Sequence, residues 1–294
     1  MGVVVSLDGV LLSGDKARVS VFDRGFLYGD SVYEVLRTYQ GVPFEEDRHL
    51  ARLLASAERI GMALPAPLRT LSEELWAAHR ASGNADSYLR LVCTRGAGPI
   101  GLDPALAIDP LRLVIAQPVQ PPPASVYEDG TSLALVSVRK NLKTAIDPRA
   151  KTGNYLNSVL AVAEAKKRGA FEAVLLDHQG TVTEGASSNV FAVLGGTILT
   201  PPVEVGILEG ITRTVILDLA RRLNLRLVET PISAGVLLAA EEILISSSIR
   251  EIVPIVKVDE VTIGGGRPGP VFGRLRAEFH RYVAEYTEAN RRTA

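Results

Sequence analysis

The chain has 294 residues, of which 47% are apolar and 22% charged, and its formal net charge is -1. This composition predicts a soluble globular protein that is long enough for two ordinary domains with their own cores. A balanced charge gives no reason to expect a polyanionic partner, so it argues against nucleic-acid binding. Cys93 is the only cysteine in the sequence, which excludes an internal disulfide and a cysteine-based metal site.

Neither a targeting sequence nor a membrane span is predicted. Residues 1–10 carry no basic region followed by a long apolar run, and no apolar stretch of the sequence approaches about 18 residues. We therefore expect a cytoplasmic protein. The 4 histidines are scattered without metal-ligand spacing, so no metal site is expected.

Residues 1–117 are predicted to form an N-terminal α/β domain. Apolar periodicity and turn residues predict, in chain order, a hairpin over Val3–Leu12, a loop over Phe22–Asp30, a strand over Ser31–Tyr39, a helix from the N-cap Asp47 to Gly61, a helix over Leu68–Ala81, and strands over Tyr88–Thr94 and Leu111–Gln117.

Residues 118–128 are predicted to be an interdomain linker, because Pro118–Pro123 reads PVQPPP and proline blocks both helix and inner strand. A C-terminal domain over 129–294 follows, and the fold class is α/β (α+β) with two domains. Its predicted elements are strands over Ser132–Val138, Glu172–Asp177, Leu225–Glu229 and Glu242–Ser246, and helices over Tyr155–Arg168, Gly210–Leu223 and Val271–Ala289.

Two glycine-rich segments could suggest a phosphate-binding loop. Gly96–Gly101 satisfies the GxGxxG pattern after a predicted strand, but Pro99 and the residues that follow disfavour the helix that a dinucleotide fingerprint requires. A surface or active-site loop is the preferred interpretation. Gly264–Gly269 is likewise interpreted as a turn before the last helix.

Residues Lys151–Ser158 read KTGNYLNS, which places a lysine on a step of small residues before an apolar-striped helix. A lysine amine needs room if a planar ligand is to reach it. Further along the chain, Glu184 lies on a predicted strand among small residues, and a buried carboxylate needs a cation to face. We therefore expect the Lys151 amine and the Glu184 carboxylate to hold opposite ends of one bound cofactor.

Three further features could hold an anion, each with an ordinary structural alternative. Ile211 and Thr212 begin a predicted helix, where backbone N–H groups and a hydroxyl suit a phosphate or simply cap the helix. Ser246–Ser248 end a strand with three hydroxyls, which could contact an anion or cap the turn. Arg52 lies on the first long helix and could bind an anion or remain solvated.

In their combined order these motifs resemble the class IV aminotransferases. The resemblance rests on Lys151, Glu184, the GITR of Gly210–Arg213 and the SSSIREI of Ser246–Ile252, and it extends from about Val3 to the final helix. The family comprises pyridoxal-phosphate enzymes of fold type IV: branched-chain aminotransferases, D-amino acid aminotransferases and aminodeoxychorismate lyases. It implies a small N-terminal α/β domain and a larger C-terminal domain with the cofactor cleft between them.

The resemblance also implies a cofactor, partners and residue roles. The cofactor is pyridoxal 5'-phosphate (PLP), the partners are small amino acids and 2-oxo acids, and the assembly is a homodimer or a higher homo-oligomer. The lysine matching Lys151 forms the Schiff base and acts as general base in a ping-pong reaction. Glu184 matches the carboxylate that pairs with the pyridine nitrogen of the cofactor. Tyr155 matches a tyrosine that contacts the ring hydroxyl, and Leu208 matches a leucine that packs on the ring face. The residues expected around the phosphate are Arg52, Ile211, Thr212, Ser247 and Ser248.

The subfamily is less sharply indicated. The segments Asp23–Gly25 and Tyr28–Glu34 resemble the D-amino acid branch and the lyases, although the lyases carry a threonine where this chain has Glu34. Tyr155 and the strand residues Tyr88–Arg90 resemble the branched-chain branch. A substrate-binding set is expected from these matches: Tyr28, Tyr33, Tyr88, Arg90, Arg95, Ser248 and Ile249.

Two of these residues depart from the family patterns. Arg95 lies earlier than the arginine of the D-amino acid enzymes, and Ile249 stands where the branched-chain branch has a small residue. The preferred prediction is a transaminase for branched-chain or other hydrophobic L-amino acids with 2-oxoglutarate. A D-amino acid or (R)-amine transaminase is the alternative, and aminodeoxychorismate lyase chemistry is a weaker one. A catalytically silent ligand-binding protein has no support, because the lysine and the glutamate are both present.

Overall fold

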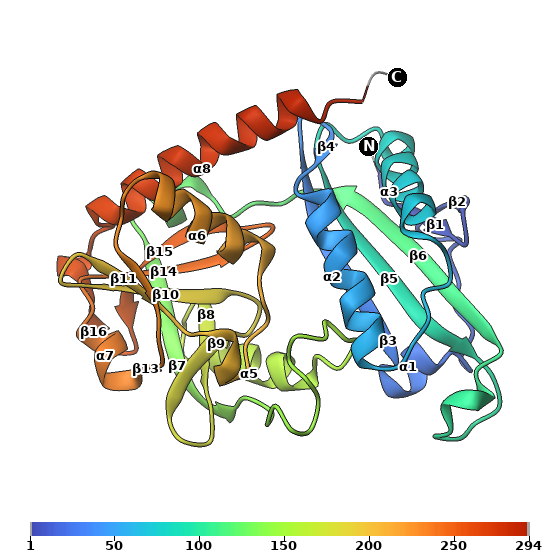
Figure 1. The fold of residues 1–294 in the computed structure, drawn as a ribbon, viewed down its shortest axis with the longest axis horizontal. Helices are drawn as coiled ribbons and strands as arrows, with labels where there is room; N and C mark the ends of the chain where they lie inside the picture. Colours follow the sequence, from blue (N-terminus) through green and yellow to red (C-terminus); the bar gives the residue numbers. More distant parts are fainter. Residues whose placement is uncertain (1, 293–294) are drawn as a thin grey trace. The chain divides into compact units, whose positions relative to one another are not determined.

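The computed structural model describes residues 2–292, which divide into two units (Figure 1). The first unit comprises the described part of Met1–Gln120, the short segment Ala150–Asn154 and the described part of Val283–Ala294. The second comprises Pro121–Arg149 and Tyr155–Tyr282. The first change of unit falls inside the proline-rich segment. Residues 150–154 and 283–292 belong to the first unit, although the sequence predicted domains of 1–117 and 129–294.

The first unit is built on a sheet with the strand order β2-β1-β6-β5-β3-β4. All neighbours in this sheet are antiparallel. Its elements are β1 (Val4–Leu7), β2 (Val10–Ser13), α1 (Arg24–Tyr28), β3 (Ser31–Tyr39), β4 (Val42–Pro43), α2 (Glu46–Arg59), α3 (Leu68–Ser82), β5 (Ser87–Ala97), a 3-10 turn (Pro104–Leu106) and β6 (Asp109–Pro118).

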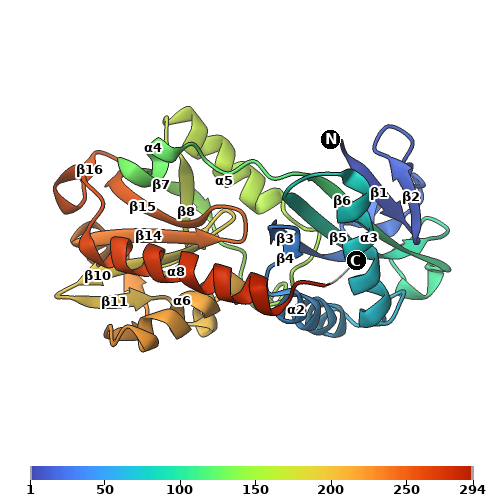
Figure 2. The ribbon, with the colours of Figure 1, turned by 90° about the horizontal axis from the view of Figure 1, so that it is seen from above.

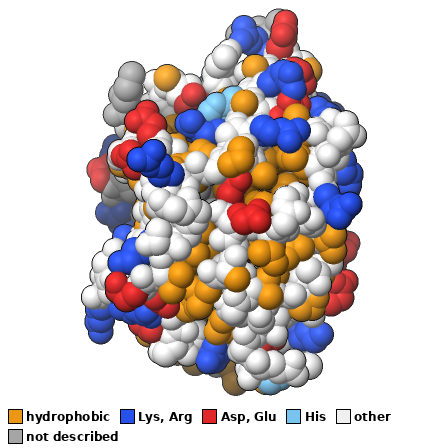
Figure 3. Space-filling view, turned by 90° about the vertical axis from the view of Figure 1, so that its left-hand side faces the viewer, with side chains coloured by type: hydrophobic (Ala, Val, Ile, Leu, Met, Phe, Trp, Pro, Cys, Tyr) orange, Lys and Arg blue, Asp and Glu red, His pale blue; other side chains and the backbone are white. Residues whose placement is uncertain are grey.

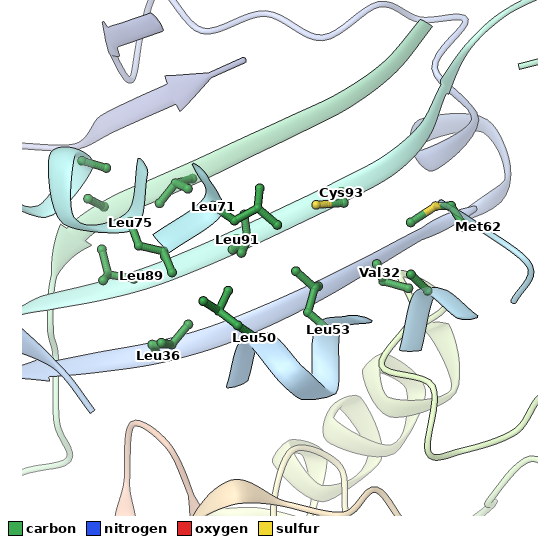
Figure 4. Packing of buried hydrophobic residues seen from close by; sticks show 14 residues of the cluster. Val32, Leu36, Leu50, Leu53, Met62, Leu71, Leu75, Leu89, Leu91 and Cys93 are labelled. Atoms are coloured by element: carbon green, nitrogen blue, oxygen red, sulfur yellow. The ribbon is translucent and has the colours of Figure 1, made fainter. Parts of the chain in front are cut away.

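Alternation along β5 explains why this sheet has one core face. Leu89, Leu91 and Cys93 are fully buried, whereas the residues between them are half-buried, as the two-residue period of a strand requires. The buried face packs against α2 and α3, which contribute Leu53 and Leu75 (Figure 4). The half-buried face therefore holds Tyr88, Arg90 and Val92, outside this core.

A buried ion pair joins α2 to β3. The Glu34 carboxylate is fully buried and accepts two hydrogen bonds from the Arg52 guanidinium, each 2.7 Å long. The His49 Nδ1 lies 2.7 Å from the same carboxylate. Burial lowers the pKa of His49, so a neutral imidazole donates its Nδ1–H here. Burial is the largest single influence and raises the pKa of Glu34, but the Arg52 charge and the hydrogen bonds from Arg52 and His49 together outweigh it and hold the pKa well below its ordinary value.

The second unit is built on a 10-stranded mixed sheet with the order β12-β11-β10-β14-β15-β7-β8-β9-β13, and β16 pairs with β15. Its elements are α4 (Ala124–Glu128), β7 (Thr131–Arg139), α5 (Leu156–Lys167), β8 (Glu172–Leu176), β9 (Thr181–Gly185), β10 (Asn189–Leu194), β11 (Thr197–Thr200), a 3-10 turn (Val203–Val205), α6 (Ile211–Arg222), β12 (Leu227–Glu229), β13 (Ile232–Ser233), α7 (Ala234–Leu238), β14 (Glu242–Ser247), β15 (Glu251–Val258), β16 (Val261–Thr262) and a 3-10 turn (Gly264–Gly266).

Helices cover the strands of the second unit (Figure 2). α5 packs on β7 and β8 through small residues, Ala161 and Ala165, which are fully buried and allow close approach. α6 lies against β14. The last helix, α8 (Pro270–Ala289), begins in the second unit and ends in residues assigned to the first. Phe272 and Phe279 of this helix are buried.

Several local predictions differ from the structure. The predicted loop Phe22–Asp30 contains α1, because the Asp23 carboxylate accepts from the Gly25 amide and caps a short helix. The predicted N-cap Asp47 lies inside the first turn of α2, since Glu45 occupies the cap position in a left-handed conformation. The strand β15 was not predicted. It contains Pro254, which lies just before the first residue that pairs with β7.

The described surface shows both signs of charge. On the face drawn in Figure 3, lysine and arginine side chains are interspersed with acidic ones and with apolar patches. Within residues 2–292, none of the helices combines the length and the apolar content that crossing a membrane requires.

The Glu34 ion pair predicts a large stability effect. We expect Glu34→Gln to lower the free energy of unfolding by about 3 kcal/mol, because it leaves the half-buried Arg52 guanidinium without its counter-charge. Since the folded-state pKa of Glu34 is depressed, its contribution is fully present above about pH 4.3 and is lost as the pH falls further. Urea unfolding of both proteins across this range measures the difference.

The matched control is Glu73→Gln, which removes an exposed carboxylate paired with Arg69 on the surface of α3. This variant is expected to change the free energy of unfolding by no more than about 1 kcal/mol. Equal losses from the two variants would contradict a special role for the buried pair.

Candidate active site

Lys151 is held against β3 by its backbone. Its carbonyl accepts from the Tyr33 amide at 3.0 Å, and the amide of Gly153 donates to the Ser31 carbonyl at 2.9 Å. Thr152 forms an antiparallel bridge with Val32. Residues 151–153 are therefore joined to β3 by an isolated antiparallel bridge and its two flanking backbone hydrogen bonds. This explains why the segment belongs to that unit.

The small residue after Thr152 is required by this pairing. A Cβ added to Gly153 would collide with the Ser31 hydroxyl and would lie 3.1 Å from the Gly29 carbonyl. In the sequence, this step suggests room for a ligand. The structure gives it a different reason, the close approach of two backbone segments.

The side chain of Lys151 lies beside an aromatic ring and a second cation. Its Nζ is 4.5 Å from the centroid of the Tyr33 ring, and the Arg90 guanidinium carbon is 3.9 Å from the same centroid. Tyr33 is buried, whereas Lys151 and Arg90 are half-buried. One ring therefore contacts both a primary amine and a guanidinium, two groups that attract carboxylate-bearing ligands.

Arg52 is linked to Lys151 through one hydroxyl. Ser56 is fully buried, donates to the Arg52 carbonyl at 2.7 Å and accepts from the Lys151 amide at 3.1 Å. The predicted cofactor residues of the first unit are thus held together by α2. The Glu34 carboxylate fixes the orientation of the Arg52 guanidinium from the other side.

In the second unit, both oxygens of the Glu184 carboxylate are engaged. Oε1 accepts from the Lys140 ammonium in a short ion pair, and Oε2 accepts from the Leu208 amide at 3.0 Å. Glu184 is 7% exposed. From the sequence, the expected cation for this carboxylate is a cofactor, whereas the structure places a lysine of the chain itself there.

Asn189 joins this carboxylate region to the start of α6. Its side-chain amide donates to the Leu208 carbonyl at 3.0 Å, and a Cβ on Gly210 would collide with its Oδ1. In the sheet, Asn189 lies opposite Ser246 of β14. The end of β14 and the beginning of α6 are therefore neighbours in the second unit.

The beginning of α6 and the end of β14 carry buried polar groups with few internal partners. The N-cap Gly210 supplies no side chain, so no side-chain oxygen of this residue caps Ile211 or Thr212. The Ser246 hydroxyl is buried and makes no hydrogen bond within the described residues. Unsatisfied donors at a helix start are favourable contacts for an anion.

The neighbouring serine is oriented by an arginine. Ser247 Oγ accepts from the Arg250 amide and from its Nε, at 3.3 and 3.2 Å. The Arg250 guanidinium in turn pairs at 2.7 Å with Glu172, a buried carboxylate, and contacts the Ser187 hydroxyl at 2.9 Å. Because Ser247 Oγ accepts twice here, its own proton is available to donate elsewhere.

Arg95 and Tyr28 lie in a different network of the first unit. The Arg95 guanidinium bonds Asp30 at 2.8 Å and the carbonyls of Ile60 and Gly61 at 2.9 Å each. The pKa of Asp30 is lowered overall: burial acts to raise it, but its two arginine partners, Arg95 and Arg24, outweigh burial. The Tyr28 hydroxyl accepts from the Gly101 amide at 3.2 Å. The Tyr28 contact holds the loop after β5, and the Arg95 contacts hold the turn after α2, so the Arg95 side chain is committed to the protein itself.

The other predicted residues occupy half-buried positions in their own units. Tyr88 lies opposite Arg37 and Gln117 on the half-buried face of β5, two residues from Arg90. Tyr155 occupies the cap position before α5. Ser248 and Ile249 form the half-buried turn after β14. The first unit thus groups Arg52, Lys151, Tyr33 and Arg90, and the second groups Glu184, Leu208, Ile211, Thr212 and the serines of β14.

Four residues that complete these groups were not predicted from the sequence: Lys140, Asn189, Ser56 and Arg250. Each of them contacts a partner that is distant in the sequence or makes a single hydrogen bond to it. Lys140 is separated from Glu184 by 44 positions, and Ser56 from Lys151 by 95. A period in the sequence carries no signal for such pairs. The one available signal was that Lys140 lies two residues after the predicted strand Ser132–Val138.

Comparison with known proteins identifies the family. The family model for amino-transferase class IV matches residues 31–258. A protein of Methanocaldococcus jannaschii, provisionally named a branched-chain-amino-acid aminotransferase, is 38% identical over 94% of each chain. A D-alanine aminotransferase of Bacillus licheniformis is 35% identical over 96% of this chain and 98% of its own.

A solved structure has the same architecture. The branched-chain aminotransferase of the thermophilic archaeon Thermoproteus uzoniensis, solved with norvaline, superposes with a TM-score of 0.89 and 33% identity. The match covers 98% of this chain and 96% of that one. The fold type IV architecture predicted from the motifs is therefore confirmed. The chain belongs to the class IV aminotransferases.

Proposed function

We propose that this aminotransferase moves an amino group between a branched-chain or other hydrophobic L-amino acid and 2-oxoglutarate, with PLP as its cofactor. One observation carries the proposal: the Lys151 amine and the Arg90 guanidinium contact the same Tyr33 ring. A substrate carboxylate paired with Arg90 would lie within reach of a group that can accept its Cα proton.

The residues present fit PLP, as its three kinds of polar group each have a counterpart. The buried Ser246 hydroxyl without a partner and the uncapped start of α6 suit a phosphate. The Glu184 carboxylate suits a protonated ring nitrogen, and Tyr155 the ring hydroxyl. Leu208, held by Glu184 and Asn189, would pack on the ring face. The proposed phosphate contacts are Arg52, Ile211, Thr212, Ser247 and Ser248.

The roles of the chain's own residues follow from these positions. PLP, when bound, supplies an electron-withdrawing ring that stabilises the negative charge left when the Cα proton departs. Lys151 would take that proton and return it one atom further along the substrate–cofactor framework. Glu184 would keep the ring nitrogen charged, and Arg90 would orient the substrate carboxylate.

Substrate preference is the finer part of the proposal. The Thermoproteus uzoniensis relative was solved with norvaline, an amino acid with an unbranched apolar side chain, which favours a hydrophobic donor here. A D-amino acid or (R)-amine transaminase is the second candidate, and the D-alanine aminotransferase relatives favour it. Against it, the Arg95 guanidinium is engaged by Asp30 and two carbonyls, so we assign that side chain a structural role.

Lys151 is expected to be indispensable. Replacing it with alanine should remove measurable turnover with every amino donor. In the parent protein, borohydride should fix PLP covalently to the peptide that contains Lys151, which mass spectrometry detects. The control is Lys143→Ala, since the Lys143 ammonium is exposed and donates to the Glu204 carbonyl. Retained turnover in Lys151→Ala, or labelling at another lysine, would contradict the assignment.

Stereochemical preference is measured with two donors. We expect keto-acid formation from L-leucine with 2-oxoglutarate, and much slower formation from D-alanine. Activity on the D-amino acid alone would replace the proposal with its alternative.

Arg90 is expected to act on binding of the carboxylate. Removing a charge-assisted hydrogen bond costs about 1.5–3 kcal/mol, so Arg90→Met should lower kcat/KM for 2-oxoglutarate by about 10- to 100-fold. Arg69→Met on the exposed face of α3 is the control and should leave kcat/KM unchanged. If both variants behave alike, Arg90 does not hold the carboxylate.

A homodimer is part of the proposal. The outer side of α5 exposes Leu156, Val159 and Leu160, which are 70%, 58% and 52% exposed in the single chain. Light scattering should give twice the mass of one chain, and Leu160→Asp should shift it toward one chain mass. Val228→Asp, at another exposed apolar position, should not. A single-chain mass for the parent protein would contradict a dimer.

A further inference from the structure

The strongest feature left unexplained by the proposed function is the lysine on the Glu184 carboxylate. The proposed role of Glu184 is to face a positively charged ring nitrogen. In the structure its Oε1 is already paired with the Lys140 ammonium. Two cations therefore compete for, or share, one buried carboxylate. The side chains of Lys140 and Glu184 are 19% and 10% exposed, so solvent screens this pair weakly.

Lys140 is built into the site by the same strands that carry Glu184. Its amide donates to the Leu176 carbonyl at 2.9 Å, directly after β7 ends. Leu176 lies on β8, which pairs with β9, the strand of Glu184. Further along the same loop, Lys143 donates to the Glu204 carbonyl at 3.0 Å, so the loop also contacts the segment that precedes Leu208. The position of Lys140 is thus fixed by the backbone.

The carboxylate has capacity for another donor. Each carboxylate oxygen accepts two hydrogen bonds, and Oε2 is held at 3.0 Å by the Leu208 amide while Oε1 meets Lys140. A lysine ammonium is a compact charge on a flexible stem, with three donors that can turn toward a neighbouring acceptor. A ring N–H can therefore join Glu184 without removing Lys140 from it.

We propose that Lys140 is a positioning residue that neutralises Glu184 before the cofactor binds and shares the carboxylate with the ring nitrogen afterwards. The identity of the second cation rests on the proposed function. A buried carboxylate without a counter-charge is strongly unfavourable, so the cofactor-free chain needs Lys140. Once the ring nitrogen is present, the carboxylate has a second counter-charge and depends less on the lysine.

This role of Lys140 predicts that its removal destabilises the cofactor-free chain more than the PLP-loaded chain. Lys140→Met should lower the unfolding midpoint of the cofactor-free chain more than that of the PLP-loaded chain, because PLP then supplies the missing charge. A deaza analogue of PLP, in which a C–H replaces the ring nitrogen, cannot supply it. The preference for PLP over the deaza analogue, as a ratio of dissociation constants, should rise about tenfold in Lys140→Met.

Three further variants make the test specific. Lys140→Arg keeps the charge and should keep both the unfolding midpoint and the ligand ratio close to those of the parent chain. Lys143→Met removes a lysine from the same loop that contacts a carbonyl, and should leave the ratio unchanged. Combining Lys140→Met with Glu184→Gln should raise the unfolding midpoint of the cofactor-free chain back toward that of the parent, since no carboxylate remains to be neutralised.

The outcomes separate this inference from the proposed function. A parent chain that binds neither PLP nor its analogue overturns the cofactor proposal, and the sharing of Glu184 with it. A parent chain that binds PLP, combined with an unchanged ratio in Lys140→Met and equal loss of midpoint in both forms, overturns the role of Lys140 alone. A raised ratio with rescue by Lys140→Arg supports it.

Discussion

The pairing of residues 151–153 with β3 is the constraint on which the first unit's chemistry depends. This segment lies far along the chain from β3 and is joined to it by one antiparallel bridge and by backbone hydrogen bonds to Ser31 and Tyr33. A single lysine side chain is flexible, but the Cα of Lys151 is fixed here by hydrogen bonds to β3 and to Ser56 of α2. The amine therefore starts from a defined position beside the Tyr33 ring.

Buried carboxylates with assigned cations are a repeated feature of both units. Glu34 faces Arg52, Glu184 faces Lys140, and Glu172 faces Arg250. In each case the carboxylate's side chain is at most 10% exposed. Such pairs contribute little net stability compared with apolar packing, yet breaking one is costly. In both units these pairs orient a neighbouring residue. Arg52 is held by Glu34, Leu208 by Glu184 and Ser247 by Arg250, and each of these holding groups is part of an ion pair.

Much of the fold could be predicted from local patterns. Apolar periodicity located α2, α3, α5 and α6, and alternation located β3 and β5, because those patterns arise from the period of each element. The short helix α1 was missed, since one Asp23 cap decides it. The division of the chain was harder to predict, because Ala150–Asn154 belongs to the first unit through contacts that form only in the folded chain.

The site could be predicted in part, and the limits are physical. A motif order indicated Lys151, Glu184 and the start of α6, and the same order indicated the family that the comparisons identify. No pattern indicated Lys140, because its partner lies 44 positions away. The step Thr152–Gly153 suggested space for a ligand, whereas the Gly153 position is closed by Ser31. Contacts that depend on tertiary packing leave no period in the sequence.

The most direct test of these assignments is a crystal structure of the chain grown with PLP. We expect continuous electron density between Lys151 Nζ and the cofactor, Glu184 at the ring nitrogen, and the phosphate against Thr212 and the serines of β14. Density linking the cofactor to another lysine, or a phosphate bound away from the start of α6, would contradict them.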